Sequence, residues 1–181
     1  TLAWEFAKKP QKDSLFYYNN MSEKFIQGDK ERGMYHVLNS KYYMIIQNFD
    51  KSKEETSLSI NFAKKVNDYN TLGSAYNTYT NIANYNGEIT KAYEYSKKNL
   101  EYTLKSNNSN KILSSYVNLN SLALNLMKYE EAKSYYNKAS KYFSKYNRQE
   151  QAIMKKNLGM ALLKLQENEK NGMIDITFFI E

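Results

Sequence analysis

The side chains best suited to chemistry are one histidine and two pairs of adjacent glutamates. His36 is the only histidine, and the pairs are Glu54-Glu55 and Glu130-Glu131. A single histidine offers little material for a catalytic dyad or a metal centre, so we interpret His36 as a packed or capping residue. Both glutamate pairs lie near the expected starts of helices, where carboxylates complement the helix dipole. Their expected role is structural.

No other pattern in the chain points to catalysis. Serine, aspartate and lysine are plentiful, but none occurs in a nucleophile elbow, a glycine-rich phosphate loop or a zinc-binding helix motif. The chain has no cysteine, which excludes disulfides and thiolate metal sites. We therefore expect a protein that is not an enzyme and that holds neither a cofactor nor a metal.

The elements that position these residues repeat every 40 positions. Aligning residues 48–56, 88–96 and 128–136 brings similar side chains into register, and searching for such a period comes before any other assignment of fold. The coinciding sets are Phe49, Ile89 and Tyr129; Ser52, Ala92 and Ala132; His36, Tyr76 and Tyr116; Tyr42, Ile82 and Leu122; and Tyr43, Ala83 and Ala123. Three consecutive units share these equivalent positions. We call the set of positions that recur every 40 residues the ladder.

Within each unit the apolar residues follow helical spacing. One stripe runs from Tyr116 to Leu126, and a second runs from Ala132 to Phe143, with a short connection between them. The spacing predicts helices near 2–9, 12–28, 31–47, 52–68, 71–86, 90–106, 111–127, 130–146 and 149–167. The expected fold is all-α, a right-handed α-solenoid of antiparallel helix pairs.

The third unit resembles the tetratricopeptide repeat. Ala132, Tyr136 and Ala139 match the closing motif of its second helix, and Gly87 occupies the turn of the middle unit. The other units depart from the motif, with Ser96 and Asn99 in the middle unit and Ser52, Thr56 and Ser59 in the first. A period of 40 exceeds the usual 34, as in the long-helix variants of bacterial regulators and peptide sensors.

The resemblance covers about residues 1–167. It implies one repeat domain with a partial first repeat, units near 31–68, 71–106 and 111–146, and the start of a further repeat. Residues 168–181 form a separate tail. Because the chain begins at Thr1 and the array opens and closes on partial repeats, we expect a piece of a longer protein.

In tetratricopeptide arrays the first helix of each pair lines a concave groove. The residues expected there are Lys41, Asn77, Asn81, Asn84, Tyr85, Asn118, Ser121 and Asn125. We call the asparagines of this set, Asn77, Asn81, Asn84, Asn118 and Asn125, the amide row. Each amide offers donors and an acceptor, which suits the backbone of an extended peptide. The alternative is that asparagine is simply abundant in a sequence rich in Asn, Lys and Tyr.

The charge pattern bears on partners. The net charge is +7, but acidic and basic residues are mixed along the chain and Arg32 and Arg148 are the only arginines. A basic footprint requires clustering on one face, so we expect no direct binding of nucleic acid. No apolar run approaches the roughly 20 residues of a membrane span. The compartment stays open, with the cytoplasm favoured and the periplasm as an alternative.

Two functions therefore compete. The first is a protein- or peptide-binding scaffold that forms the sensory or interaction region of a larger bacterial regulatory protein. The second is a self-associating structural module, whose exposed repeat ends form a homodimer.

The C-terminal tail breaks the helical pattern. Ile174, Ile176, Phe178 and Ile180 alternate along the chain as the residues on one face of a strand do. We expect residues 173–180 to cover the apolar end of the array or to dock onto a neighbouring chain. The alternative is a truncated, frayed helix.

Overall fold

The computed structural model describes residues 23–24, 26–144 and 147–177, with side chains up to Lys170. Throughout this part the chain is helical and contains no strand, so the expected all-α repeat fold is confirmed. The helices expected near 2–9 and 12–28 lie outside the described residues, except for the last positions. Of these, residues 26–28 are not helical and directly precede the first long helix.

The chain divides into two compact units, with the boundary between Asn108 and Ser109. Unit 1 contains α2 (Asp29–Ile45), α3 (Phe49–Lys65), α4 (Tyr69–Tyr85) and α5 (Ile89–Lys105). Unit 2 contains α6 (Ser109–Asn125), α7 (Tyr129–Ala139), a 3-10 turn η1 (Ser140–Tyr142) and α8 (Arg148–Thr177).

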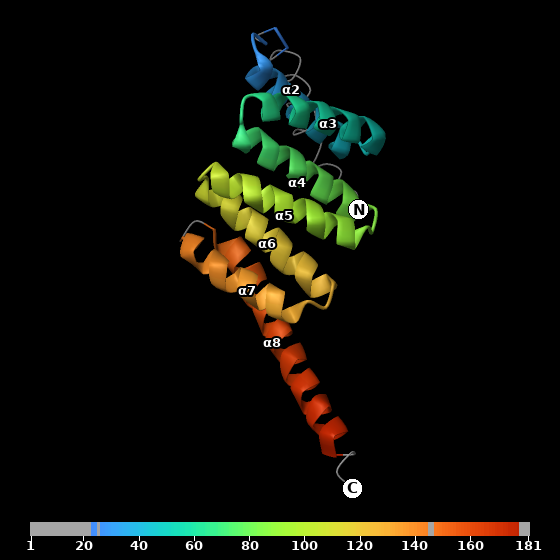
Figure 1. The fold of residues 1–181 in the computed structure, drawn as a ribbon, viewed down its shortest axis with the longest axis vertical. Helices are drawn as coiled ribbons and strands as arrows, with labels where there is room; N and C mark the ends of the chain where they lie inside the picture. Colours follow the sequence, from blue (N-terminus) through green and yellow to red (C-terminus); the bar gives the residue numbers. More distant parts are fainter. Residues whose placement is uncertain (1–22, 25, 145–146, 178–181) are drawn as a thin grey trace. The chain divides into compact units, whose positions relative to one another are not determined.

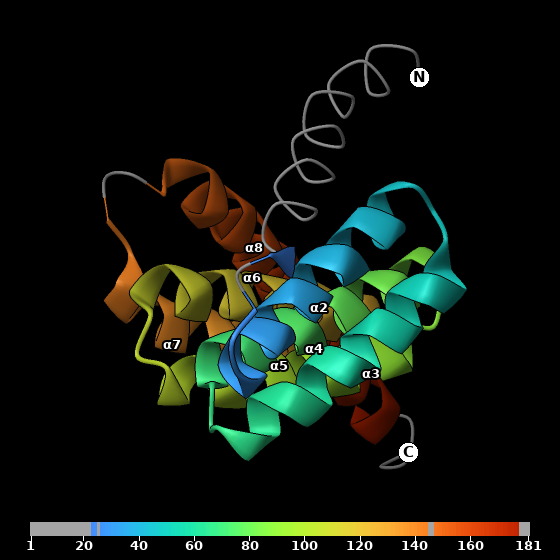
Figure 2. The same cartoon turned by 90° about the horizontal axis from the view of Figure 1, so that it is seen from above.

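Unit 1 consists of two antiparallel helix pairs. Helix α2 packs along α3 and α4 packs along α5, while α4 also contacts both helices of the first pair. Figure 2 looks along this unit, with the α2–α3 pair in front of the α4–α5 pair. Its core is built from Val37, Ile60, Ala63, Leu72, Ala75 and Tyr76. This packing fixes which face of α4 remains available to solvent.

Unit 2 repeats the pairing once and adds half of a further pair. Helix α6 packs along α7, and α8 contacts both of them (Figure 1). Leu113 and Leu119 of α6, Ala132 and Ala139 of α7, and Met154 of α8 are all buried in this unit. Helix α8 therefore occupies the position of the first helix of a fourth pair.

The helices begin every 20 residues because one turn recurs. The residues with positive φ are Gln47, Asn67, Gly87, Asn107 and Met127, each two positions beyond the end of a helix. At Gly87 the backbone N–H donates to the Asn84 carbonyl and the next N–H donates to the Ala83 carbonyl, which is the Schellman arrangement. Only three residues separate one of these helices from the next, for example 86–88 between α4 and α5, so neighbouring helices must run antiparallel.

Side chains cap some of these turns. The Asn48 amide oxygen accepts from the backbone N–H of Lys51, and the Asp68 carboxylate accepts from both the N–H and the hydroxyl of Thr71. These caps start α3 and α4 at Phe49 and Tyr69, two to three residues earlier than the sequence predicted. The expected starts were late because the capping roles of Asn48 and Asp68 were not recognised in the sequence.

The last two helices differ more from the prediction. Helix α7 ends at Ala139 instead of 146, because a 3-10 turn follows and Phe143 adopts an extended backbone. Helix α8 was expected to end at 167 but continues to Thr177. The strand-like conformation expected from residue 173 is therefore wrong for residues 173–177, and residues 178–180 lie outside the described part of the chain.

The small residues expected between the helices of each pair are confirmed. Ser52, Ala92 and Ala132, which share one ladder position, are completely buried. A side chain this small lets the two helices approach closely, and any larger one would have to displace the partner helix. The 40-residue register deduced from the sequence thus places equivalent side chains at equivalent depths.

Candidate functional site

The centre of the predicted groove lies on α4. Asn81 and Asn84 are exposed, whereas Leu72, Tyr76 and Ala83 of the same helix are buried. At 100° per residue Asn81 projects from the side of α4 opposite these core residues, and Asn84 lies at the edge of the same exposed face. The exposed face of α4 therefore carries amide side chains, and we call it the amide surface of α4.

Lys41 and Asn77 are half-buried. Asn77 occupies the ladder position of Asn157 on α8, which is buried and donates from its amide to Asn120 Oδ1 at 2.7 Å and to Ser121 Oγ at 3.0 Å. Eighty residues earlier, Asn77 is equivalent to Asn157 and Lys41 is equivalent to Ser121, and helices α2 and α4 contact each other. Lys41 and Asn77 are both less accessible than Asn81.

The residues of the predicted groove in unit 2 also differ in their exposure. Asn125 is exposed at the end of α6, whereas Asn118 and Ser121 are half-buried. Ser121 accepts the hydrogen bond from Asn157, and Asn120 in turn donates to the Ala132 carbonyl at 2.8 Å. The buried amides Asn120 and Asn157, which sequence reasoning did not single out, tie α6, α7 and α8 together.

Tyr85 combines exposure with a structural contact. Its side chain is 61% exposed, yet its ring lies 4.7 Å from the ring of Phe49. The hydroxyl donates to Gln47 Oε1 at 3.4 Å. Tyr85 therefore packs over the α2–α3 turn and presents the remainder of its ring at the end of the α4 amide surface.

A hollow of about 240 Å³ lies on the other side of α4, between α3 and α5. Tyr79 and Tyr95 form one wall, with ring centroids 5.0 Å apart, and the Tyr79 hydroxyl donates to the Lys53 carbonyl at 3.2 Å. Burial is the main reason that the pKa of Tyr79 is raised above its usual value. Glu88 and Lys91 form an ion pair of 3.0 Å at the rim.

The sequence placed no site at this hollow. Its tyrosines fall at core spacing, and the partly exposed rings could be told from buried ones only once the gap between α3 and α5 was known. The hollow is large enough for a single side chain of a partner and smaller than a typical small-molecule pocket.

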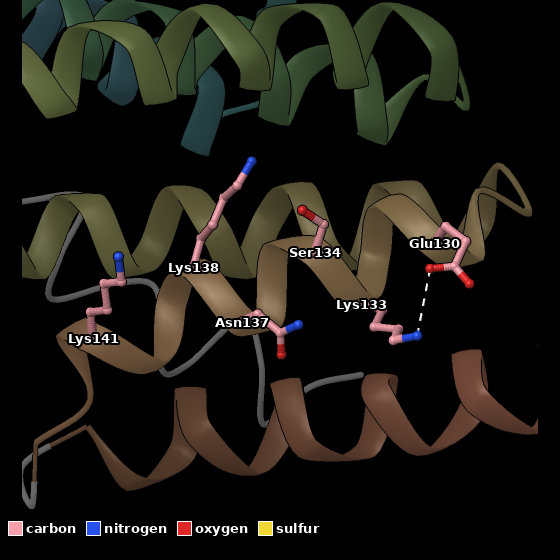
Figure 3. A pocket seen from close by; sticks show the side chains of 6 residues that line it. All are labelled: Glu130, Lys133, Ser134, Asn137, Lys138 and Lys141. Carbon is pink, nitrogen blue, oxygen red and sulfur yellow. Dashed lines mark ion pairs between the residues drawn. The ribbon is translucent and has the colours of Figure 1, made fainter.

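The outer face of α7 is basic. Figure 3 shows Lys133, Lys138 and Lys141 around an open hollow of about 380 Å³, with Glu130 paired to Lys133 at 3.7 Å. Because all of the lining residues belong to one helix and the turn that follows it, this surface is shallow and exposed. Isolated lysines on such a face attract anions weakly and are screened by salt.

His36 makes the contacts of a packed residue. Its Nδ1 lies 2.7 Å from Glu55 Oε2, and its ring stacks on Phe62 with centroids 5.4 Å apart. The pair joins α2 to α3, which agrees with the structural interpretation of both residues. Tyr76 and Tyr102, which occupy the ladder positions of His36 and Phe62, form the equivalent stacked pair between α4 and α5.

The described residues contain no group of three or more His, Asp or Glu side chains arranged to hold a metal ion. Among the same residues, no helix has both the length and the apolar character that crossing a membrane requires. The arrangement at α4 offers hydrogen-bond donors, acceptors and an aromatic edge, which are the means of non-covalent recognition.

Neither the models of known protein families nor the curated proteins contain a match to this chain.

Proposed function

We propose that this chain is a tetratricopeptide-like binding module that holds an extended peptide or protein segment along the first helices of its repeats. The observation that supports the proposal is the exposure of Asn81 and Asn84 on the face of α4 opposite the core. Asparagine is a middling helix former, so two exposed asparagines in the second half of one helix lower its intrinsic stability. A ligand that uses their amides would offset that cost.

The chemistry of the proposed contact is backbone recognition. An amide side chain donates through its NH₂ group and accepts through its oxygen, so Asn81 and Asn84 can pair with the N–H and C=O groups of an extended peptide. Such contacts tolerate many sequences. Selectivity then comes from side chains that meet the exposed ring of Tyr85 or the ammonium group of Lys41. Because a flexible peptide loses entropy on binding, the expected affinity is roughly micromolar.

The resemblance to long-helix tetratricopeptide repeats extends this proposal. By analogy with the bacterial regulators and peptide sensors that use such repeats, the chain serves as the sensory or interaction region of a larger regulatory protein. It contributes binding and no catalysis of its own. A ligand-dependent change in a partner domain would then be the biological output.

The test is a peptide-library screen followed by affinity measurements on an Asn81→Ala/Asn84→Ala variant. Each lost hydrogen bond costs about 0.5–1.5 kcal/mol, so the double variant should bind its best peptides roughly 5- to 150-fold more weakly. The matched control is Asn61→Ala, which removes an exposed asparagine from α3. Circular dichroism verifies that each variant folds.

Two results would contradict the proposal. If the double variant retains full affinity for every peptide in the screen, the asparagines of α4 reflect composition alone. If Asn61→Ala weakens binding as much as the double variant does, the amide surface of α4 is not the site.

A further inference from the structure

The first helix of each pair has two positions that always face its partner helix. At the first position the Gly33 carbonyl accepts from Ser59 and the Gly73 carbonyl accepts from Asn99. The second position, seven residues later, is occupied by Ser40, Thr80 and Asn120, all buried. A partner helix therefore covers this face in all three pairs.

On α8 the same two ladder positions are apolar and exposed. Ile153 stands where Gly33, Gly73 and Leu113 stand in the earlier helices, and Met160 stands where Ser40, Thr80 and Asn120 stand. Ile153 is 38% exposed, Met160 is 46% exposed and the neighbouring Leu163 is 62% exposed. The face that should contact a partner helix is thus open.

The chain itself does not close this face within its described part. Each earlier turn places a residue with positive φ at a 20-residue interval, and the next position in that series is Glu167. Glu167 lies inside α8, which runs on for ten more residues to Thr177. Residues 168–177 therefore extend along the axis of α8 and do not fold back over Ile153 and Met160.

The earlier pairs also indicate what covers such a face. The covering helix places small or short side chains at its fourth and eleventh positions, which are Ser52 and Ser59, Ala92 and Asn99, and Ala132 and Ala139. Helix α8 carries two small residues with the same seven-residue spacing, Ala152 and Gly159, and both are exposed. A Cβ atom added at Gly159 would meet nothing within 4 Å.

Large and small residues thus lie side by side on one face of α8. We name Ile153, Met160, Leu163, Ala152 and Gly159 the open stripe. Spacings of 7 and 11 residues keep Ala152, Gly159 and Leu163 in line, Ile153 and Met160 form a second line about 100° round the helix, and the exposed Lys156 lies between the two lines. A surface that carries both the protruding side chains and the recesses that receive them can pair with its own copy.

We propose that the open stripe is a self-association surface on which α8 of a second copy packs, crossing near Gly159. In this arrangement Ile153, Met160 and Leu163 of each copy lie over Ala152 and Gly159 of the other, and the two contacts are related by two-fold symmetry. The helices run antiparallel, because a parallel pair would place the two Lys156 ammonium groups against each other on the stripe.

The test is the molar mass of the full 181-residue chain, measured by light scattering or sedimentation over a wide range of concentrations. The mass should rise from that of the 21.3 kDa monomer to about twice this value. A Met160→Glu/Leu163→Glu variant places charges in the contact and should remain monomeric throughout the range. The matched control is Leu162→Glu, since Leu162 is 45% exposed on the same helix but outside the open stripe, and this variant should still dimerise.

A second variant covers the possibility that the two glutamates disturb folding. Gly159→Leu favours helix formation and fills only open space in the monomer, but it blocks the crossing point. It should reduce dimerisation at least tenfold while circular dichroism stays unchanged. The proposal is overturned if the chain is monomeric at every concentration, if the dimer survives both stripe variants, or if Leu162→Glu dissociates it equally.

Discussion

The α4–α5 and α6–α7 pairs share one ladder but close their helix contacts differently. In α4–α5 the Gly73 carbonyl accepts from Asn99 at 2.7 Å, and a Cβ atom at Gly73 would lie 3.0 Å from the Thr103 methyl group. In α6–α7 the equivalents of Gly73 and Asn99 are Leu113 and Ala139, both buried. Helix α7 has 11 residues where α5 has 17.

The two pairs thus accommodate the close approach of their two helices in different ways. A glycine with a hydrogen-bonded partner lets two helices run side by side over their full length. A leucine at that position needs space, and α7 ends at the position of the small partner, Ala139, before its last turn can collide with it. The α2–α3 pair resembles the α4–α5 pair, because Ser59 donates to the carbonyl of Gly33 where Asn99 donates to that of Gly73.

The largest effect is expected when Gly73 of the α4–α5 pair is replaced by the leucine that occupies this position in the α6–α7 pair. Gly73→Leu should destabilise the protein by about 3 kcal/mol, because the side chain would overlap Thr103 of a helix that does not end early. Urea unfolding measures the change. The same substitution at Gly159, measured at a concentration where the chain is monomeric, should not destabilise, and an unchanged midpoint for Gly73→Leu would refute the close contact.

Removing the hydrogen bond tests the other half of the same contact. Asn99→Ala creates the residue found in the third pair but leaves the Gly73 carbonyl without its side-chain donor in a buried place, which should cost about 1–2 kcal/mol. Thermal unfolding of this variant is compared with that of Asn61→Ala, an exposed asparagine on α3. Equal stability of the two variants would mean that the bond contributes nothing.

Opposite substitutions in the turns of the two pairs should change stability by a smaller amount and in opposite directions. Gly87 and Met127 occupy the same turn position with φ of 73° and 58°, a conformation that costs a side-chain-bearing residue about 1 kcal/mol. Gly87→Ala should therefore lower stability by about 1 kcal/mol. Met127→Gly should raise it by about 0.5–1 kcal/mol, because the Met127 side chain is 75% exposed and little packing is lost. Melting temperatures that shift in the same direction would contradict this assignment.

The sequence predicted the repeat well because its signal is redundant. Three copies of each ladder position report the same environment, as Ser52, Ala92 and Ala132 illustrate. Helix ends were less predictable, since the left-handed turn position is occupied by Gln47 and Met127 as well as by asparagine and glycine. Nothing local in the sequence marks a turn of this kind at Gln47.

The candidate site was predictable only in part. Helical spacing correctly placed Asn81 and Asn84 away from the core, because that side of α4 follows from its own sequence. The burial of Asn157 against Asn120 depends on how α8 packs on α6, which periodicity within one helix does not encode. The open stripe was missed for the same reason, because it is defined by the partner helix that α8 lacks.

The smallest expected effect separates two residues that share one ladder position. Asn81 of α4 is exposed, whereas Ser121 of α6 accepts a hydrogen bond from Asn157. Asn81→Ala should raise stability by a few tenths of a kcal/mol, because alanine is the better helix former. Ser121→Ala should bring no such gain, because the lost bond of about 0.5–1.5 kcal/mol offsets it. Chemical unfolding of both variants in parallel resolves the difference.

An asparagine whose removal stabilises the chain has no structural reason for its place in α4. Two explanations then remain, a ligand contact and the abundance of asparagine in this chain, and the peptide screen distinguishes them. If Asn81→Ala instead destabilises the chain by 1 kcal/mol or more, Asn81 has a structural partner of its own. In that case the amide surface of α4 belongs to the scaffold, and the hollow between α3 and α5 becomes the better place to look for a ligand.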